Sequence, residues 1–308
     1  MILVFGSLNM DLVMTVPVLP KPGETVLCPG YTLKPGGKGN NQAVAAARAG
    51  APVAMAGCVG PDAFGSGLVE NLVRAGVDTS GIHLVEQPTG CAMICVDADA
   101  ENFISVASGA NLAAASDRVE DSRLGPGTTV LMQMEVPAEQ NWALIRRAHD
   151  LGSRTVLNVA PAADVPPEVL KLIDVLVVNE HEAAEIADRL GLSASSATGL
   201  ARDLARTCGV TCVVTLGSAG ALMAESDGAL WTAAPLKINP VDTTGAGDAF
   251  CGILTAALDG GAEPAEALHR ASVGASLACM ALGAQESLPT SEAIDARLHE
   301  VAEPLRLS

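Results

Sequence analysis

Short apolar segments alternate with helical patterns along most of the chain, and this alternation limits the fold more than any other feature. Strands are predicted over 2–5, 53–59, 129–134, 155–159, 175–178 and 212–216, and helices over 40–49, 64–75, 139–151, 167–173, 182–190 and 197–207. Strands that alternate with helices form βαβ units, whose parallel sheet is covered on both faces. We therefore predict an α/β fold, a three-layer α/β/α sandwich with a mostly parallel central sheet.

The composition indicates a folded chain with a large core. Of its 308 residues, 49 % are hydrophobic and 17 % are charged, and the net charge of −17 argues against a broad nucleic-acid-binding face. No apolar run approaches the ~20 residues of a membrane span, and the first residues lack the basic start of a signal peptide. We therefore expect a cytoplasmic protein with no nucleic-acid and no membrane partner. The eight cysteines include no CxxC pair, which indicates buried thiols rather than a disulfide framework.

Two segments depart from the alternating pattern. Residues 13–35 contain five prolines, and residues 89–108 read as two strands, 91–96 and 103–106, joined by a polar turn over 97–102. We predict that 13–35 and 89–108 form a small β-sheet lid, while 1–12, 36–88 and 109–308 form the α/β core. Lids commonly exclude water from transfer chemistry. The structural alternative is two ordinary excursions at the edge of the main sheet.

The segment 241–250, VDTTGAGDAF, is the strongest indication of chemistry. A helical apolar pattern begins directly after it, so Gly245, Ala246, Gly247 and Asp248 are expected at a helix N-terminus. Free backbone N–H groups and the positive end of the helix dipole favour an anion there. A carboxylate beside such an anion site is suited to take a proton from a hydroxyl that attacks a phosphoryl group. The alternative is a turn followed by a helix with an aspartate cap.

Two polar clusters near the N-terminus have the chemistry of a ligand site. Asn9 and Asp11 follow the first strand two residues apart, so in an extended segment they face the same way and suit vicinal hydroxyls. Gly36–Gln42 opens a helix with three glycines, Lys38 and two asparagines, which permits a close backbone approach to a ligand. It is not a Walker A loop, because Gly39 follows the lysine. A strand-end turn and a solvated helix start are the alternatives.

Three more clusters follow later strands. Glu135 is expected either in the same cleft or in a surface turn. Asn179 and Glu182 lie three apart at a helix start, which fits either control of a hydrated Mg²⁺ or a capping box. Thr215–Gly220 fits either phosphate binding through backbone N–H groups or a simple hairpin. Because active sites of parallel sheets lie at the carboxyl ends of the strands, the five clusters together predict a phosphotransferase site there.

In their order and spacing, these motifs resemble those of the ribokinase-like (PfkB) carbohydrate kinase family, which also includes fructokinases and adenosine kinases. The resemblance covers nearly the whole chain. It is carried by Gly6–Asp11, Gly36–Ala43, Gly109–Asn111, Asn179–Glu182, Thr215–Gly220, Val241–Phe250 and Gly283–Ser287. That family has an α/β sandwich core and a small β lid that also forms a dimer interface. The resemblance therefore implies a homodimer that associates through the lid.

The resemblance also implies roles by position. Asp248 would be the general base, and the anion hole for the γ-phosphoryl group would be formed by Gly245, Ala246 and Gly247. The sugar site would be formed by Asn9, Asp11, Gly37, Lys38, Asn41, Glu135 and Asp248. The Mg-nucleotide site, in which Glu182 acts on Mg²⁺ through water, would be formed by Asn179, Glu182, Thr215, Gly217, Gly220 and Gly247. A monovalent cation site, for K⁺, would be formed by Asp242, Thr244, Gly283 and Ser287.

We therefore expect an ATP-dependent kinase that phosphorylates the 5-hydroxyl of D-ribose and uses Mg²⁺, with K⁺ as an activator. Another pentose, a ketohexose or a nucleoside is the alternative acceptor, and Asn40 stands where the family usually carries alanine. The lid segments hold only Tyr31 and Phe103 as aromatic residues, which favours a bare sugar over a nucleoside. From other classes, a non-catalytic sugar-binding protein is disfavoured by the intact Asp248. A nicotinamide-dependent oxidoreductase is disfavoured because Phe250 replaces the last glycine of a GxGxxG motif.

Overall fold

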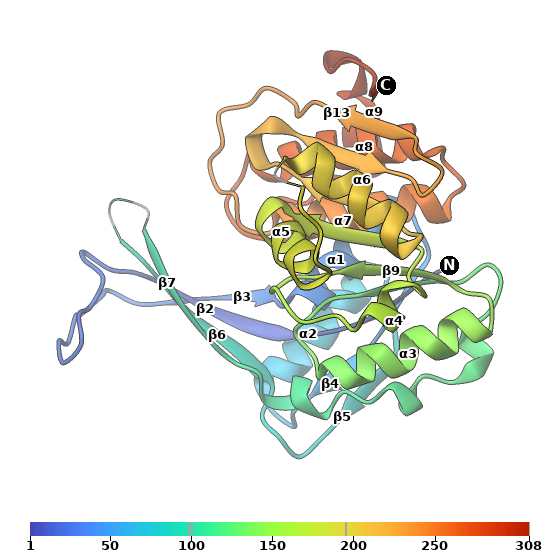
Figure 1. Ribbon diagram of the computed structural model, residues 1–308. Helices are drawn as coiled ribbons and strands as arrows, with labels where there is room; N and C mark the ends of the chain where they lie inside the picture. The colour runs from blue at the N-terminus through green and yellow to red at the C-terminus, as the bar shows by residue number, and fades with distance from the viewer. Residues whose placement is uncertain (98, 100, 195, 308) are drawn as a thin grey trace.

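The computed structural model describes residues 1–97, 99, 101–194 and 196–307. Figure 1 shows a large sheet with helices on both sides and a small sheet that projects away from this body. Both sheets are built from segments distant in sequence, and the strand order of each is defined by its backbone hydrogen bonds. The predicted fold class is confirmed: an α/β/α sandwich that carries a second, smaller sheet.

Within the described residues, ten strands form the main sheet in the order β14-β13-β12-β11-β10-β9-β8-β1-β4-β5. From β11 to β5 every neighbouring pair is parallel, whereas β12, β13 and β14 extend one edge in antiparallel fashion. The strands are β1 (Ile2–Phe5), β4 (Val53–Val59), β5 (Asp78–Leu84), β8 (Thr129–Met132), β9 (Arg154–Asn158), β10 (Val175–Asn179), β11 (Thr211–Thr215), β12 (Ala221–Ala224), β13 (Leu230–Ala233) and β14 (Leu305–Leu307).

The side chains of β1 show why helices cover both faces of this sheet. Leu3 and Phe5 belong to the hydrophobic core on one face, and Ile2 and Val4 belong to the core on the other. Successive strand residues point to opposite faces, so an apolar run without polar interruption requires burial on both sides. All four side chains are at most 1 % exposed.

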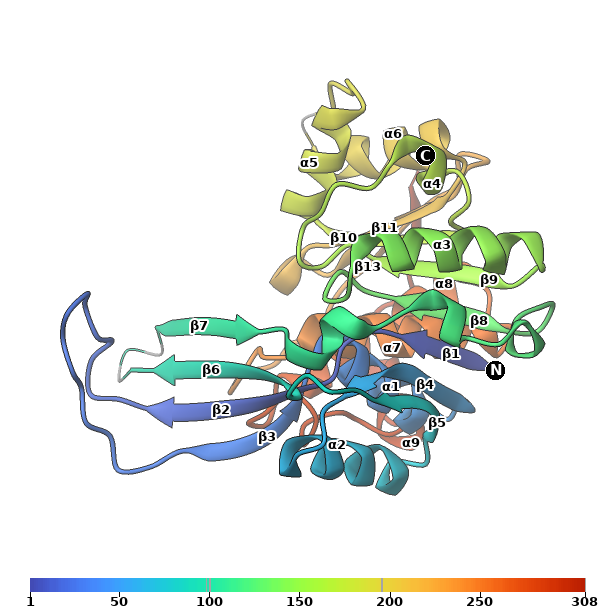
Figure 2. The same cartoon turned by 90° about the horizontal axis from the view of Figure 1, so that it is seen from below.

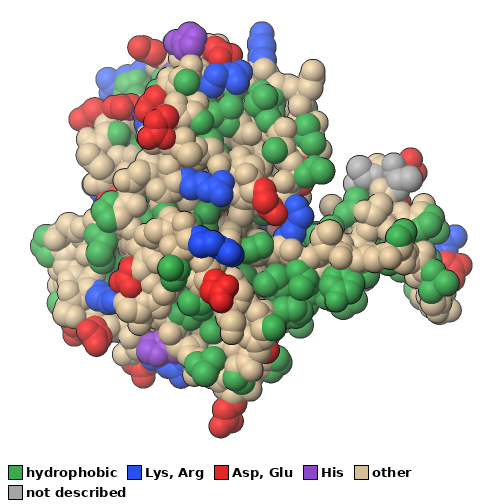
Figure 3. All heavy atoms as spheres, turned by 180° about the vertical axis from the view of Figure 1, so that it is seen from behind, with side chains coloured by type: hydrophobic (Ala, Val, Ile, Leu, Met, Phe, Trp, Pro, Cys, Tyr) green, Lys and Arg blue, Asp and Glu red, His purple; other side chains and the backbone are tan. Residues whose placement is uncertain are grey.

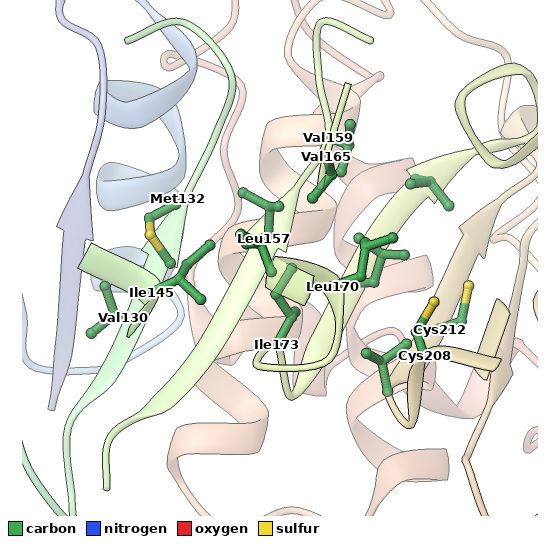
Figure 4. Close-up of a cluster of buried hydrophobic side chains, with 14 of the residues drawn as sticks. Val130, Met132, Ile145, Leu157, Val159, Val165, Leu170, Ile173, Cys208 and Cys212 are labelled. Atoms are coloured by element: carbon green, nitrogen blue, oxygen red, sulfur yellow. The ribbon is translucent and has the colours of Figure 1, made fainter. Parts of the chain in front are cut away.

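Each core is closed by its own set of helices. One set is α3 (Ala138–Asp150), α4 (Pro167–Leu170), α5 (Glu180–Arg189) and α6 (Ala197–Cys208). The other set is α1 (Lys38–Arg48), α2 (Ala63–Arg74), α7 (Ala246–Asp259), α8 (Pro264–Ala278) and α9 (Ser291–Asp295). Figure 4 shows part of the first core, in which Met132 and Leu157 from neighbouring strands lie beside Ile145 of α3 and Leu170 of α4.

The small sheet projects from the body as Figure 2 shows, with strand order β3-β2-β6-β7. Its strands are β2 (Asn9–Thr15), β3 (Thr32–Gly36), β6 (Gly90–Val96) and β7 (Asn102–Ala107). The predicted strand pair 91–96 and 103–106 is confirmed as β6 and β7. The small sheet is larger than the predicted lid segments 13–35 and 89–108, because β2 begins at Asn9 and β3 extends to Gly36. Of the turn predicted over 97–102, residues 98 and 100 lie outside the described residues.

The described residues contain no disulfide bond. All eight cysteines are free, and Cys58, Cys208, Cys212 and Cys251 are buried. None of the helices within residues 1–97, 101–194 and 196–307 is both long enough and apolar enough to cross a bilayer.

Helices α1 and α7 pack so closely that one position has room only for glycine. A Cβ on Gly252 of α7 would lie 2.6 Å from the carbonyl oxygen of Gln42 and 2.6 Å from the Cβ of Ala45, both in α1. Neither neighbour can rotate away, since one is backbone and the other is the first carbon of a side chain. Gly67 is also within a helix, α2, but a Cβ there would meet only the Cε of Met10, at 3.8 Å.

We expect Gly252→Ala to lower the free energy of unfolding by about 1–3 kcal/mol, the usual cost of overpacking. Gly67→Ala is the matched control and should raise it by roughly 0.5–1 kcal/mol, because alanine has the higher helix propensity. Urea unfolding followed by circular dichroism measures both values. A Gly252→Ala protein as stable as the parent would contradict the close α1–α7 contact.

Candidate active site

The candidate site lies where the carboxyl ends of the parallel strands meet. Ser7 follows β1 and donates from its hydroxyl to Glu135, which follows β8, at 2.6 Å. Asn158 ends β9, and its side-chain oxygen accepts from Gln42 of α1 at 3.1 Å. Parallel strands end at one edge of the sheet, so polar residues far apart in sequence converge there.

The N-terminus of α7 faces this edge with free backbone donors. Gly245 precedes the helix with φ of 76°, and its carbonyl accepts the first helical bond, from the N–H of Ala249. The N–H of Ala246 donates to the carbonyl of Thr243 at 3.2 Å, whereas the N–H groups of Gly247 and Asp248 have no acceptor in the helix ladder. A Cβ on Gly245 would lie 2.9 Å from the Cβ of Ala284, so glycine is required both for its φ and for this contact. This geometry supports the predicted anion site.

Asp248 lies in the first turn of α7 and is only 7 % exposed. Its two carboxylate oxygens accept from different side chains of α1. Asn41 Nδ2 donates to Oδ2 at 2.9 Å, and Gln42 Nε2 donates to Oδ1 at 3.0 Å. The negative charge of Asp248 raises the pKa of Lys38, an effect that burial of the lysine opposes. The structure thus gathers a buried carboxylate, two amides and a cation at one point.

Glu135 joins the glycine-rich turn to the end of β8. Its Oε2 accepts from the hydroxyl of Ser7 and, at 3.0 Å, from the backbone N–H of Lys38. The Ser7 hydroxyl in turn accepts from the N–H of Gly39 at 3.2 Å. Glu135 is therefore half-buried and bonded to the glycine-rich turn, which favours the interpretation that it belongs to the site.

Asn9 and Asp11 come from β2, beside the same turn. Asn111 Nδ2 donates to Asn9 Oδ1 at 2.7 Å, and a Cβ on Gly37 would lie 2.7 Å from the backbone nitrogen of Asn9. Gly37 has φ of 87°, so this position favours glycine both for its backbone conformation and for its close contact with Asn9. Burial, together with the negative charges of Glu135 and Asp248, raises the pKa of Asp11 to about 7. The predicted sugar-site residues are thus brought together.

On the other side of the α7 N-terminus lies a cavity of about 480 Å³. Its lining includes the predicted nucleotide residues Thr215, Gly217, Gly220 and Gly247, together with Ala246. The segment 235–238, which the sequence analysis did not single out, forms another wall. The cavity and the sugar-side cluster are therefore adjacent to the same helix N-terminus.

Asn179 and Glu182 do not line this cavity. They form the capping box of α5: Asn179 Oδ1 accepts from the N–H of Glu182, and Glu182 Oε2 accepts from the N–H of Asn179, each at 2.8 Å. Burial raises the pKa of Glu182, against the effect of the Asn179 hydrogen bond. The capping-box interpretation of Asn179 and Glu182 is therefore confirmed. The second carboxylate oxygen of Glu182 takes no part in the capping box.

The four residues of the predicted cation site also converge. The Asp242 carboxylate accepts from the N–H of Thr244 and from the N–H of Gly283, both at 2.9 Å. The Ser287 hydroxyl donates to the carbonyl of Gly283 at 2.6 Å. Although burial acts to raise it, these hydrogen bonds keep the pKa of Asp242 below its usual value. An ionised carboxylate among backbone groups is thus available at this position.

The sequence analysis did not identify three buried amide side chains that belong to this site. Gln133 and Asn158 each interrupt an apolar run at the end of a strand, and Gln285 lies within the segment Gly283–Ser287. Their polarity beside buried strands was a usable signal, but the sequence did not say which groups they meet. Each one is linked to Asn41 or Gln42 by a hydrogen bond.

Known proteins resemble this chain over almost its whole length. Residues 1–291 match the model of the pfkB family of carbohydrate kinases. The chain is 37 % identical to the ribokinase of Haemophilus influenzae, covering 94 % of this chain and 95 % of that protein. It is 36 % identical to the ribokinase of Bacillus subtilis, covering 96 % and 98 % respectively.

Among solved structures, the chain is similar to a ribokinase from Thermotoga maritima, with a TM-score of 0.89 and 32 % identity over 97 % of this chain and 99 % of the other. It is also similar to an Arabidopsis thaliana ribokinase complexed with ribose and ATP, with a TM-score of 0.86 and 29 % identity over 96 % and 98 %. The chain therefore belongs to the pfkB family of carbohydrate kinases.

Proposed function

We propose that the protein transfers the γ-phosphoryl group of ATP to the 5-hydroxyl of D-ribose, forming ribose 5-phosphate and ADP. The position of Asp248 is the observation that carries the proposal. Its carboxylate lies in the first turn of α7, between the sugar-side cluster and the cavity of about 480 Å³. The similarity to ribokinases over almost the whole chain supports ribose as acceptor and ATP as donor.

The chemistry needs few groups. Asp248 takes the proton of the acceptor hydroxyl as that oxygen attacks the γ-phosphorus. The free N–H groups of Gly247 and Asp248 stabilise the negative charge on the transferring group. Because phosphoryl transfer depends mainly on positioning and charge stabilisation, a helix N-terminus and one base carry most of the protein's contribution.

The sugar-side cluster is suited to hold a polyhydroxylated acceptor. The Asp11 carboxylate accepts hydrogen bonds, while Asn9 and Asn41 present amides and Lys38 a cation. Asn9 Oδ1 is already held by Asn111, so its amide nitrogen remains for the sugar. We assign ribose binding to these residues, together with Gly37 and Glu135.

A divalent ion fits the nucleotide side only through water. No group of three His, Cys, Asp or Glu side chains suited to a metal occurs among the described residues. Magnesium keeps several waters and is usually bound through one or two carboxylates plus substrate phosphates. We therefore assign it to the Glu182 oxygen outside the capping box, which would act through water because Glu182 does not line the cavity. Magnesium would neutralise phosphate charge, while the chain positions the nucleotide through Thr215, Gly217 and Gly220.

A monovalent cation fits the loop around Asp242. Oxygen ligands suit hard cations, and the loop offers the Asp242 carboxylate, which the N–H groups of Thr244 and Gly283 hold in place, and the carbonyl of Gly283. Since Ala284 of this loop also contacts Gly245, a cation bound there would stabilise the loop that supports the α7 N-terminus. We assign K⁺ to this site, with Ser287 completing it.

A coupled ADP-release assay tests the function. With Mg-ATP and K⁺ we expect strong turnover of ribose and little of 2-deoxyribose, fructose or adenosine. Removal of Mg²⁺ with EDTA should abolish turnover, and replacement of K⁺ by a large organic cation should lower it. Turnover of another acceptor alone would replace ribose in the proposal, and equal rates in both monovalent salts would remove the K⁺ assignment.

Asp248→Asn is the matched control for this assay. It keeps the side-chain volume but cannot take the proton, so kcat should fall about 10²- to 10⁴-fold. Ribose binding, measured by calorimetry, should persist. A variant with near-normal kcat would show that Asp248 is not the base.

The pKa of Asp11 predicts a pH dependence. With a pKa of about 7, Asp11 is largely neutral at pH 6 and ionised at pH 8. Only the ionised form accepts hydrogen bonds with both oxygens, so kcat/KM for ribose should rise as pH increases through about 7. Asp11→Asn should lower kcat/KM and remove this rise. A flat profile between pH 6 and 8 in the parent enzyme would contradict the assignment.

We also propose that the protein forms a homodimer through the small sheet. The strand register places Asp11 beside Ala92, Ala92 opposite Val106, and Ile94 opposite Ile104, so these side chains share one face. On that face Ile104 is 52 % and Val106 51 % exposed. Figure 3 shows hydrophobic side chains on the projecting arm and where it joins the body. Exposed apolar groups gathered in this way are typical of an interaction surface.

Ile104→Lys should weaken or abolish the dimer, because it buries a charge in the proposed interface. Met93→Lys is the matched control: Met93 is also 52 % exposed but lies on the opposite face of the sheet. Size-exclusion chromatography with light scattering gives the mass of each protein. A dimer that survives Ile104→Lys, or that is lost equally in Met93→Lys, would contradict this interface.

A further inference from the structure

Two chains of side-chain amides lead outward from the Asp248 carboxylate. In the first, Gln42 Nε2 donates to Asp248 Oδ1 at 3.0 Å, and Gln42 Oε1 accepts from Gln133 Nε2 at 2.8 Å. The second hydrogen of Gln42 Nε2 goes to Asn158 Oδ1 at 3.1 Å, and Asn158 donates to the carbonyl of Val177 at 3.2 Å. Both ends of the Gln42 amide are therefore in use.

The second chain begins at the other carboxylate oxygen. Asn41 Nδ2 donates to Asp248 Oδ2 at 2.9 Å, and Asn41 Oδ1 accepts from Gln285 Nε2 at 2.9 Å. Gln285 Oε1 accepts from Asn71 Nδ2 at 2.7 Å. The two chains thus hold the two oxygens from different directions.

The charge of Asp248 fixes the direction of every amide in these chains. An ionised carboxylate only accepts hydrogen bonds, so Gln42 and Asn41 must turn their NH₂ groups toward it. Their oxygens then point away and require donors, which Gln133 and Gln285 supply. Reversal of one amide would place its oxygen against the carboxylate and leave a buried donor without a partner, at considerable cost.

Burial makes the arrangement rigid. Gln42 and Gln133 are 0 % exposed, and Gln285 is 4 % exposed. The backbone of Gln42 also packs against α7, because its carbonyl oxygen lies 2.6 Å from the position that a Cβ on Gly252 would take. Side chain and backbone together therefore fix Gln42 relative to the helix that carries Asp248.

We propose that Gln42 is a positioning residue, which fixes the rotation of the Asp248 carboxylate so that one lone pair faces the acceptor hydroxyl. This inference rests on the proposed role of Asp248 as the base. Gln42 is not available to a sugar or a nucleotide, because it is 0 % exposed and its two amide hydrogens and its oxygen already bond Asp248, Asn158 and Gln133. Its effect on the reaction therefore passes through Asp248 alone.

The test is Gln42→Met, which keeps a similar length and volume but removes the donor. Loss of one hydrogen bond to a charged group should lower kcat about 10- to 100-fold. The KM values for ribose and ATP should stay within about twofold, because positioning acts on the chemical step rather than on binding. Thr255→Val is the control, since it removes a buried polar group of α7 that bonds only to Cys251 of its own helix; it should leave kcat unchanged.

A double-mutant comparison separates this inference from the function itself. In the Asp248→Asn background, Gln42→Met should cause no further loss of kcat, because the group through which it acts is already disabled. Equal losses in both backgrounds, or a loss that appears in KM instead of kcat, would overturn the positioning role. If Asp248→Asn itself retained normal kcat, the proposed base would be wrong as well.

Gln133→Met provides a second variant if Gln42→Met does not fold. It leaves Gln42 in place but removes the donor that fixes the direction of its amide. We expect a smaller loss of kcat, on the order of 3- to 10-fold, again with unchanged KM values. A fully active Gln133→Met protein with the parent's kcat would overturn the proposal that the chain fixes Asp248.

Discussion

The hydrogen bonding of one buried carboxylate organises the site. Asp248 is 7 % exposed, and burial of an ionised carboxylate is costly unless donors replace the lost water. The protein supplies neutral amides from α1, which stabilise the charge without forming an ion pair at hydrogen-bonding distance. In the function proposed above, such an environment holds the carboxylate in one orientation while it acts as the base. Both hydrogen bonds require the close contact between α1 and α7. This contact is possible because residue 252 of α7 is a glycine, which has no side chain.

The parallel sheet explains how so many polar groups reach Asp248. Glu135, Asn158 and Thr215 stand at or just beyond the ends of β8, β9 and β11 and are therefore delivered to one edge. Helices α1, α5 and α7 begin at the same edge, so their N-termini face it. An anionic substrate thus meets helix N-termini, which offset the chain's overall charge of −17 locally.

The small sheet and the main body share the acceptor side of the site. Asn9 and Asp11 belong to β2 of the small sheet, whereas Glu135 and Asp248 belong to the body. Asn111 joins the two parts, because its side chain bonds both the backbone of Leu8 and the side chain of Asn9. The residues proposed to bind the sugar are therefore coupled to the sheet that is proposed to mediate dimerisation.

The sequence by itself determined the α/β class, the projecting strand pair, and a helix N-terminus with Asp248 in its first turn, because each depends on local periodicity or on glycine chemistry. It did not reveal β5, β13 or β14, which are partly polar, short or at a sheet edge, where pairing outweighs propensity. The hairpin alternative at Thr215–Gly220 corresponds to the antiparallel pair of β11 and β12. It also left Asn179 and Glu182 open between a capping box and a metal role. Only the tertiary structure decided that Gln42 bonds Asp248 and that Gln133 and Gln285 bond the two amides that hold its carboxylate. An amide has no periodic signature, and its partners are chosen by strand order and helix packing between residues far apart in the chain.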